Sequence, residues 1–381
     1  MNDVGQSRTP LSMSMHSVKI GLLALLTLAT SPAFAGDREY PLLGGVVIRP
    51  YGQFDFAYQG FDDGEAQADS LVDNSNSNTR IGFYIYHPEA EQDLQFHFET
   101  GLGFRPSQDT SQIFEPEFWD WQRTDIRKLQ LIHSGTLGTL KFGQGSMPMD
   151  GITEIDLAGT VVAAKATIPE GAGSYILRSE NGAFSGIVIG DSFDNLDGDR
   201  KFRVRYDTPS FQGFSIGAAY GVEVLTEDVD DHYFDITLRY HHDFGRYDLK
   251  GGVGMGFVDG EDADTHTYAG SISVMDQSTG LNLSLAAGGD NAGARYLYMK
   301  PGWNAKLFEI GTTKFMGEAF WGADYVTDGS SSDMWGAAII QDIDPWNTEV
   351  YLGYRHFSYD DLTAEAYRDA DLFKVGGRLR Y

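Results

Sequence analysis

The fold class is decided by the last stretch of the chain, Phe373-Lys374-Val375-Gly376-Gly377-Arg378-Leu379-Arg380-Tyr381. Apolar side chains alternate there with Lys and Arg, so one face of the expected strand is apolar and the other is cationic up to the final residue. A soluble sandwich could bury the apolar face, but it would not usually end on an aromatic residue within a strand. A lipid-facing barrel strand, with its terminal aromatic in an interfacial girdle, accounts for both features.

The same two-residue alternation recurs along the chain. It is found at residues 53–58, 80–86, 94–99, 202–206, 234–240 and 350–355. Charged residues occupy the polar face in one segment after another, and a buried charge without a partner costs several kcal/mol. We therefore expect the polar face to be wet, and the apolar face to be covered by something other than a protein core.

Composition narrows the class of protein further. The chain of 381 residues has 28 Lys+Arg against 55 Asp+Glu, a net charge of −27, which makes nucleic acid a poor candidate partner. It holds no cysteine, which excludes disulfides, thiolate metal sites and a cysteine nucleophile. Its 46 glycines, 24 Phe and 20 Tyr are typical of many strands and tight turns.

The N-terminus has the pattern of a secretory signal. Arg8 and Lys19 precede an apolar stretch over 20–29, and a small-x-small cleavage pattern ends at Ala35. The apolar stretch is well short of the about 20 residues that span a bilayer, and no later run is longer. We expect a cleaved signal peptide over 1–35 and a single domain over 36–381, either a soluble periplasmic β-protein or an outer-membrane barrel.

Turn signals fall into two classes. Seven short turns are expected near residues 88–92, 134–138, 208–212, 242–246, 276–280, 306–312 and 342–347. Eight longer stretches, most of them acidic, lie at 61–75, 104–122, 223–231, 258–264, 288–294, 326–332, 359–370 and after Gln144. An antiparallel up-and-down barrel with short turns on one rim and long loops on the other needs this ratio for 16 strands. The sequence therefore predicts an all-β transmembrane barrel of 16 strands.

One interval between turns is much longer than the others, because a segment from Gln144 to Arg200 is inserted after the fifth strand. Within it, residues 174–178 and 183–190 flank Ser179-Glu180-Asn181-Gly182, which could form a hairpin. If this hairpin joins the wall, the barrel has 18 strands instead of 16.

Four segments resemble motifs of the general Gram-negative porin family, in the right order: Asn78-Thr79-Arg80-Ile81-Gly82-Phe83, Leu137-Gly138-Thr139-Leu140-Lys141-Phe142-Gly143-Gln144, Arg205-Tyr206-Asp207-Thr208-Pro209-Ser210-Phe211-Gln212-Gly213-Phe214 and Leu352-Gly353-Tyr354-Arg355-His356. The resemblance implies a homotrimer of 16-stranded barrels in the outer membrane of a Gram-negative bacterium, in contact with lipid and lipopolysaccharide. It also implies that the long third loop folds inward and forms a constriction, where acidic residues of the loop face basic residues of the wall.

Candidate pore residues come from the inserted segment and from the alternation. The acidic candidates on the loop are Asp150, Glu154, Asp156 and Glu170, which could equally be ordinary solvated charges. The basic candidates on the lumen side of the wall are Arg80, Arg203, Arg205, Arg49, Lys128 and Arg355, which could also lie elsewhere in a wide lumen. Facing rows of opposite charge would order water and favour polar solutes. We predict no cofactor, no specific metal site and no catalytic group, since neither an EF-hand spacing nor a nucleophile elbow occurs.

The leading functional hypothesis is an outer-membrane porin for passive diffusion of small hydrophilic solutes and ions, with a weak cation preference suggested by the net charge. One alternative is a porin selective for sugars or phosphate, in which Tyr84, Tyr86 and Tyr351 are possible members of an aromatic slide. Two further alternatives are an outer-membrane enzyme, and a structural barrel whose lumen is filled by the segment from Gln144 to Arg200.

Overall fold

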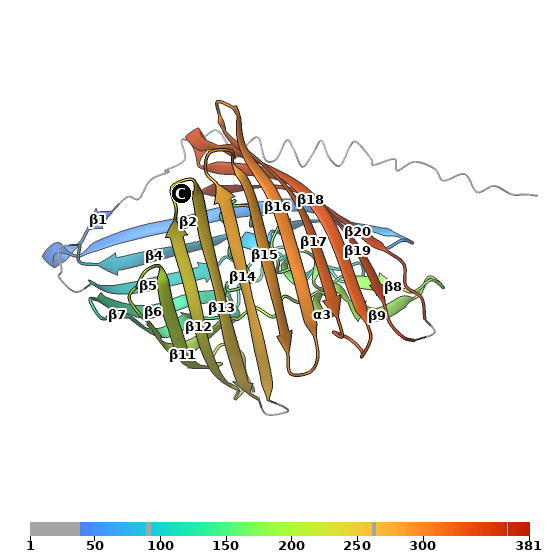
Figure 1. The fold of residues 1–381 in the computed structure, drawn as a ribbon, viewed down its shortest axis with the longest axis horizontal. Helices are drawn as coiled ribbons and strands as arrows, with labels where there is room; N and C mark the ends of the chain where they lie inside the picture. The colour runs from blue at the N-terminus through green and yellow to red at the C-terminus, as the bar shows by residue number, and fades with distance from the viewer. Residues whose placement is uncertain (1–38, 89–92, 261–263, 364) are drawn as a thin grey trace, which may run out of the picture. The chain divides into compact units, whose positions relative to one another are not determined.

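A single antiparallel sheet makes up most of the computed structural model (Figure 1). The structure describes residues 39–88, 93–260, 264–363 and 365–381. The predicted signal peptide, residues 1–35, lies outside the described residues, as does most of the first predicted turn. In the described part of the chain, no helix is long and apolar enough to cross a membrane.

The first part of the wall contains one interrupted strand. Its strands are β2 (Val47–Asp62), β3 (Gln67–Asp73), β4 (Arg80–Tyr86), β5 (Asp93–Gly101), β6 (Ile126–Gly135) and β7 (Gly138–Ser146), and the short β1 (Tyr40–Pro41) pairs with the start of β2. β3 and β4 pair with the two halves of β2 and are separated by the 3-10 turn η3 (Ser75–Ser77). The prediction of a loop over 61–75 is therefore wrong in part, because β3 is extended and bonded to β2.

The second part of the wall is regular and closes the sheet. Its strands are β10 (Arg200–Asp207), β11 (Phe214–Val222), β12 (His232–Asp243), β13 (Tyr247–Asp259), β14 (Thr265–Asp276), β15 (Leu281–Asp290), β16 (Arg295–Phe308), β17 (Gly311–Ala323), β18 (Ser331–Ile343), β19 (Thr348–Asp360) and β20 (Ala370–Arg380). β7 pairs with β10 and β20 pairs with β2, so no edge is left. Counting β3 and β4 as one and leaving β1 aside, the closed wall has 16 strands, as predicted.

Connections of two lengths alternate between the two rims. Tight turns join β6 to β7, β10 to β11, β12 to β13, β14 to β15, β16 to β17 and β18 to β19. Gly280 and Gly311 lie at two of these turns, and the 3-10 turn η5 (Asp344–Trp346) forms a third. A Cβ atom on Gly280 would lie 1.9 Å from the carbonyl oxygen of Asn304, so only glycine fits there. The other rim carries the longer loops, including a second loop over 102–125 with the 3-10 turn η4 (Arg123–Asp125) and a third loop over 147–199. A further 3-10 turn, η2 (Leu43–Gly45), lies before β2.

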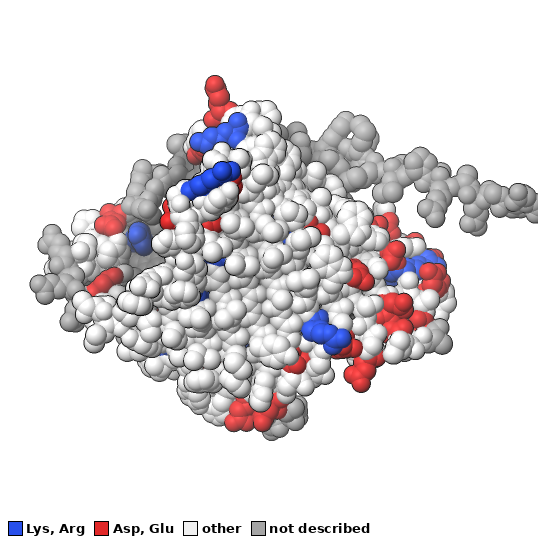
Figure 2. Space-filling view, viewed as in Figure 1, with Lys and Arg blue, Asp and Glu red and all other residues white. Residues whose placement is uncertain are grey.

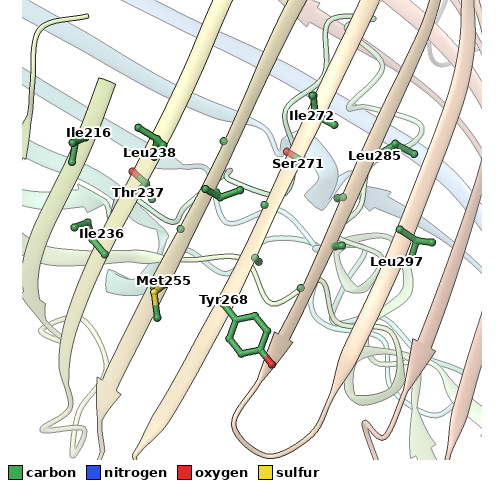
Figure 3. A pocket seen from close by; sticks show the side chains of 18 residues that line it. Ile216, Ile236, Thr237, Leu238, Met255, Tyr268, Ser271, Ile272, Leu285 and Leu297 are labelled. Carbon is green, nitrogen blue, oxygen red and sulfur yellow. The ribbon is translucent and has the colours of Figure 1, made fainter. Parts of the chain in front are cut away.

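The alternation sorts the side chains onto two faces as expected. On β10, Phe202, Val204 and Tyr206 are exposed on the outside, whereas Arg203 is only 2% exposed on the inside. Figure 2 shows a broad outer area without charged side chains, with acidic groups gathered toward the edges where the longer loops lie. A shallow apolar groove of about 900 Å³ crosses this outer face from β11 to β16, lined by side chains such as Tyr268, Ile272 and Leu285 (Figure 3). The groove belongs to the face predicted to contact lipid.

The third loop lies against the inner face of the wall. It contains α2 (Pro169–Ala172), β8 (Ile176–Arg178), β9 (Phe184–Val188) and α3 (Ile189–Ser192). β8 and β9 form the predicted hairpin, but they make a separate two-stranded sheet. The alternative of 18 wall strands is therefore wrong, because β7 pairs directly with β10 and leaves the hairpin no place in the wall.

Candidate pore constriction

Apolar contacts fix one side of the third loop to the wall. Phe193 lies 5.3 Å from Phe357 and 5.7 Å from Phe320, measured between ring centroids. Tyr175 of the loop stacks on Phe61 of β2 at 4.1 Å. These rings belong to one buried cluster that joins the loop to β2 and to β15–β20. Each aromatic pair adds roughly 0.5–1.5 kcal/mol to the burial of its area, so this side of the loop is held firmly.

The interrupted strand holds the tip of the loop. The side-chain amide of Asn74 donates to the carbonyl oxygen of Val162 at 2.8 Å, and Asn76 donates to the same oxygen at 3.4 Å. Asn74 also donates to the hydroxyl of Tyr351, which in turn donates to Asp55 at 2.6 Å. Tyr351 is 3% exposed beneath this tip, so its predicted place in an aromatic slide is wrong.

Two of the predicted pore residues lie behind the loop. Asp156 pairs with Lys300 of β16 at 3.1 Å, and both side chains are buried. Arg355 of β19 pairs with Glu318 of β17 at 2.8 Å and donates to the backbone oxygen of Lys165 at 3.1 Å. The structure thus uses Asp156 and Arg355 to attach the loop to the wall.

Arg203 and Arg205 face the lumen as predicted, and both hold the chain where β7 enters the loop. Arg203 donates to the carbonyl oxygens of Gly143 at 2.6 Å and Ser146 at 3.1 Å. Arg205 donates to the carbonyl oxygen of Met147 at 2.9 Å and pairs with Asp207 at 2.8 Å. Most of their donors are occupied, which leaves these two arginines little to offer a solute.

The other three acidic candidates of the loop are partly exposed. Glu154 lies 2.9 Å from the ammonium of Lys165, which also pairs with Glu170. The side chains of Glu154 and Glu170 are 22% and 25% exposed. Asp150 is 22% exposed and lies 3.8 Å from Arg200 at the start of β10. These three residues form the acidic edge of the loop, with one internal cation.

A cationic cluster on the wall stays wet as well. Arg80, Arg127 and Lys128 surround the buried carboxylate of Glu99, at 3.7, 2.8 and 3.7 Å. A bulge in the pairing between β5 and β6 brings the consecutive Arg127 and Lys128 to the same carboxylate. The exposed fractions of these three cations are 21–26%, against 4% for Glu99.

Arg200 links the two charged sets electrostatically. Its guanidinium is acted on by the charges of Asp150 and Glu170 of the loop and by that of Glu99 of the wall. Arg200, Arg127 and Glu99 are absent from the candidates drawn from the sequence. The alternation over 94–99 does put Glu99 on the lumen side, whereas the bulge that turns Arg127 inward has no signal in the sequence.

Arg49 lies further along β2, toward the rim of tight turns. Its guanidinium carbon is 5.1 Å from the ring centroid of Tyr84 and 5.6 Å from that of Tyr86. Register pairs Arg49 with Tyr84 and Tyr84 with His97, so all of these side chains share the inner face. Arg49 is half-buried in this row.

Comparisons with known proteins agree with this geometry. A family model described as "Gram-negative porin" matches residues 22–378. Among solved structures, the anion-selective porin from Comamonas acidovorans is similar over 88% of this chain and 100% of its own, at 13% identity and a TM-score of 0.61. OmpF of Salmonella typhi, in complex with daunomycin, is similar over 90% and 100%, at 13% identity and a TM-score of 0.55.

The outer membrane channel DcaP of Acinetobacter baumannii has the same fold, over 90% of this chain and 99% of its own, at 11% identity and a TM-score of 0.54. A search of curated proteins finds no match. At these identities the solved structures speak for the fold, whereas the family model covers nearly the whole chain. The closed 16-stranded wall, the inward third loop and the match over residues 22–378 lead to one conclusion: the chain belongs to the Gram-negative porin family.

Proposed function

We propose that the protein is an outer-membrane channel through which small hydrophilic solutes and ions diffuse passively. The main observation behind this proposal is that two sets of oppositely charged side chains remain in contact with water inside a wall whose outer face is apolar. The side chains of Glu154 and Glu170 on the third loop are 22% and 25% exposed, and those of Arg80 and Lys128 on the wall are 22% and 26% exposed. Charges held in water inside a closed wall fit an aqueous path better than a filled lumen.

Ion preference in this proposal depends on where the charges lie. Net charge favours a weak preference for cations, as predicted from the sequence. Arg80, Arg127 and Lys128 all pair with the carboxylate of Glu99, so this cluster of the wall has more cations than acids. The acids of the outer loops act only over the Debye length, about 8 Å at physiological salt. We propose that the cation preference is a property of the acidic mouth, while the constriction itself favours anions.

We also propose that three copies assemble through the second loop. Its Ile113, Phe114 and Trp119 are 65%, 62% and 61% exposed in the single chain. Phe104 and Phe118 of the same loop pack on Phe56, which lies on the outer face of β2. Aromatic residues of this kind are enriched at interface centres. The trimeric form of OmpT of Vibrio cholerae, a protein of the same fold, is consistent with this assembly.

Export in this proposal uses the segment 1–35 as a cleaved signal peptide, followed by insertion into the outer membrane next to lipid and lipopolysaccharide. N-terminal sequencing of the membrane-extracted protein should then begin at Gly36. An N-terminus at Met1 would refute the cleavage.

The deciding experiment is a planar-bilayer recording of the purified protein. We expect stepwise openings, closure in three equal steps at high voltage, and a measurable reversal potential in a KCl gradient. The absence of conductance from protein that shows the β-rich circular dichroism of a folded barrel would overturn the channel and favour a structural barrel. Openings that close in one step would refute the trimer alone.

A further inference from the structure

The inner wall carries a row of aromatic rings beside an arginine, on the side of the constriction nearer the tight turns. The ring of Tyr84 stacks on that of His97 at 3.9 Å and on that of Tyr51 at 5.6 Å. Arg49 lies over both Tyr84 and Tyr86. Gly82 makes this row possible, because a Cβ atom there would lie 2.6 Å from the ring of Tyr51.

Hydrogen bonds fix two rings of the row, those of Tyr51 and His97. The hydroxyl of Tyr51 lies 2.7 Å from Nε2 of His97 and donates to Glu99 at 2.6 Å. The side-chain amide of Gln130 lies 3.0 Å from Nδ1 of the same histidine. Tyr84 therefore stacks on two rings that are held in place before any solute arrives, which reduces the entropy lost on binding.

Arg49 differs from the cations of the constriction in how its charge is used. Arg80, Arg127 and Lys128 share Glu99 as a counter-charge. Within the described part of the chain, no carboxylate lies within ion-pair distance of Arg49, whose described contacts are the faces of Tyr84 and Tyr86. Glu39 accepts a hydrogen bond from the hydroxyl of Tyr86. A guanidinium that lies on rings keeps its in-plane N–H donors available for a carboxylate.

The distance from the constriction follows from the register. Arg80 pairs with Gln53, four residues along β2 from Arg49, which corresponds to about 13 Å at the usual rise per strand residue. The charges of Lys128, Glu99 and Arg49 all act on His97, so the row continues the charged surface of the constriction. A solute that passes the constriction meets these rings next.

We propose that Arg49, Tyr84 and Tyr86 form a binding subsite for aromatic carboxylates, with the carboxylate on the guanidinium and the ring against the tyrosines. This inference rests on the proposed channel function and names a solute class for it. A small aliphatic anion would use Arg49 alone, and a neutral ring would use the tyrosines alone. Aromatic carboxylates use both, so they should bind most tightly.

The test measures block of the single-channel KCl current by benzoate, acetate and benzyl alcohol, each added over a range of concentrations. We expect benzoate to block saturably, with a half-blocking concentration about tenfold or more below those of acetate and benzyl alcohol. Arg49→Gln should raise the half-blocking concentration of benzoate about tenfold, and Tyr84→Leu should raise it several-fold while leaving acetate unchanged.

Lys141→Gln is the matched control. Lys141 lies on the inner face of β7, paired with Asp207 at 2.9 Å, and its exposed fraction of 26% equals that of Lys128. It should leave block by benzoate unchanged. If Tyr84→Leu does not fold, as judged by its heat-dependent mobility on a denaturing gel, Tyr86→Leu replaces it. Equal block by benzoate and acetate in a conducting wild-type channel, or equal effects of Arg49→Gln and Lys141→Gln, would overturn the subsite alone. A folded wild-type protein without conductance would overturn the channel and the subsite together.

Discussion

Lys300 is the wall residue whose loss should loosen the third loop most. Its ammonium donates to Thr160 at 2.7 Å and to the carbonyl oxygen of Ala164 at 3.0 Å, and it pairs with Asp156 at 3.1 Å. Lys300→Met keeps the length of the side chain and removes the charge and the donors. Asp156 then stays buried with its backbone partners at Ala158 and Thr160, but without a counter-charge.

The magnitude follows from the carboxylate. Burial raises the pKa of Asp156, but Lys300 and the N–H groups of Thr160 and Ala158 more than offset it and hold the pKa at about 2, against an ordinary value of 3.8. That difference corresponds to about 2.5 kcal/mol in favour of the ionised form. Removing one partner of a buried pair costs about 3–5 kcal/mol. A loss of about 3 kcal/mol would raise the released fraction of this part of the loop roughly 100-fold.

The assay is the frequency of brief closures in single-channel records, which reports movement of the loop. Because the pKa of Asp156 is depressed in the folded loop, its stabilisation is present above pH 3.8 and is lost as the pH falls toward 2. In Lys300→Met the pKa of Asp156 should rise. Closures should therefore be frequent at pH 7, and the closure frequency should change at a higher pH than in wild type. Lys306→Met, an exposed lysine on the same strand, is the control. Equal closure frequencies for the two variants at pH 7 would refute this account of the loop.

Three further outcomes are expected. Glu99→Gln should raise the anion-to-cation permeability ratio roughly fivefold, since one unit charge at the constriction contributes on the order of 1 kcal/mol; an unchanged reversal potential would argue against the cationic cluster. Trp119→Ala should weaken the trimer by about 2 kcal/mol and lower its dissociation temperature on denaturing gels. Phe211→Ala, at an exposed residue of a tight turn, should not lower this temperature, and equal effects of the two variants would contradict the proposed interface. The reversal potential should favour cations in about 10 mM salt and anions in about 1 M salt, because the Debye length falls from about 30 to 3 Å; the same sign at both would rule out the division between mouth and constriction.

The barrel could be predicted from the sequence because its signal is local. Alternation along residues 373–381 and in the other segments is a property of neighbours in the chain, and so are the turn residues that separate the strands. β3 over Gln67–Asp73 escaped prediction, since it follows an acidic turn and stops at the polar run 74–79. That run interrupts the wall strand and lets Asn74 and Asn76 donate to the third loop. A contact between segments so far apart in the sequence leaves no local pattern.

The candidate site could be predicted only as far as the face of each residue. Alternation puts Arg80, Arg203 and Arg355 in the lumen, and all three point there. Which of them stays wet depends on partners far away in the sequence, such as Glu318 for Arg355 and the carbonyl oxygen of Gly143 for Arg203. The same limit applies to the acids, since Asp156 is two residues from Glu154 yet pairs with Lys300 of the wall, whereas Glu154 pairs with Lys165 of the loop.

The division of the third loop into two sides explains how one set of lumen charges serves two purposes. An apolar side with Phe193 and Tyr175 must be buried against the wall, and any charge within that contact must be paired, as Arg355 and Lys300 are. Charges beyond the contact are partly exposed, as Glu154 and Glu170 of the loop and Arg80 of the wall are. In the proposed channel, selectivity at the constriction is set by which charges the loop leaves uncovered. On this proposal a chain with a net charge of −27 presents an inner wall that attracts anions.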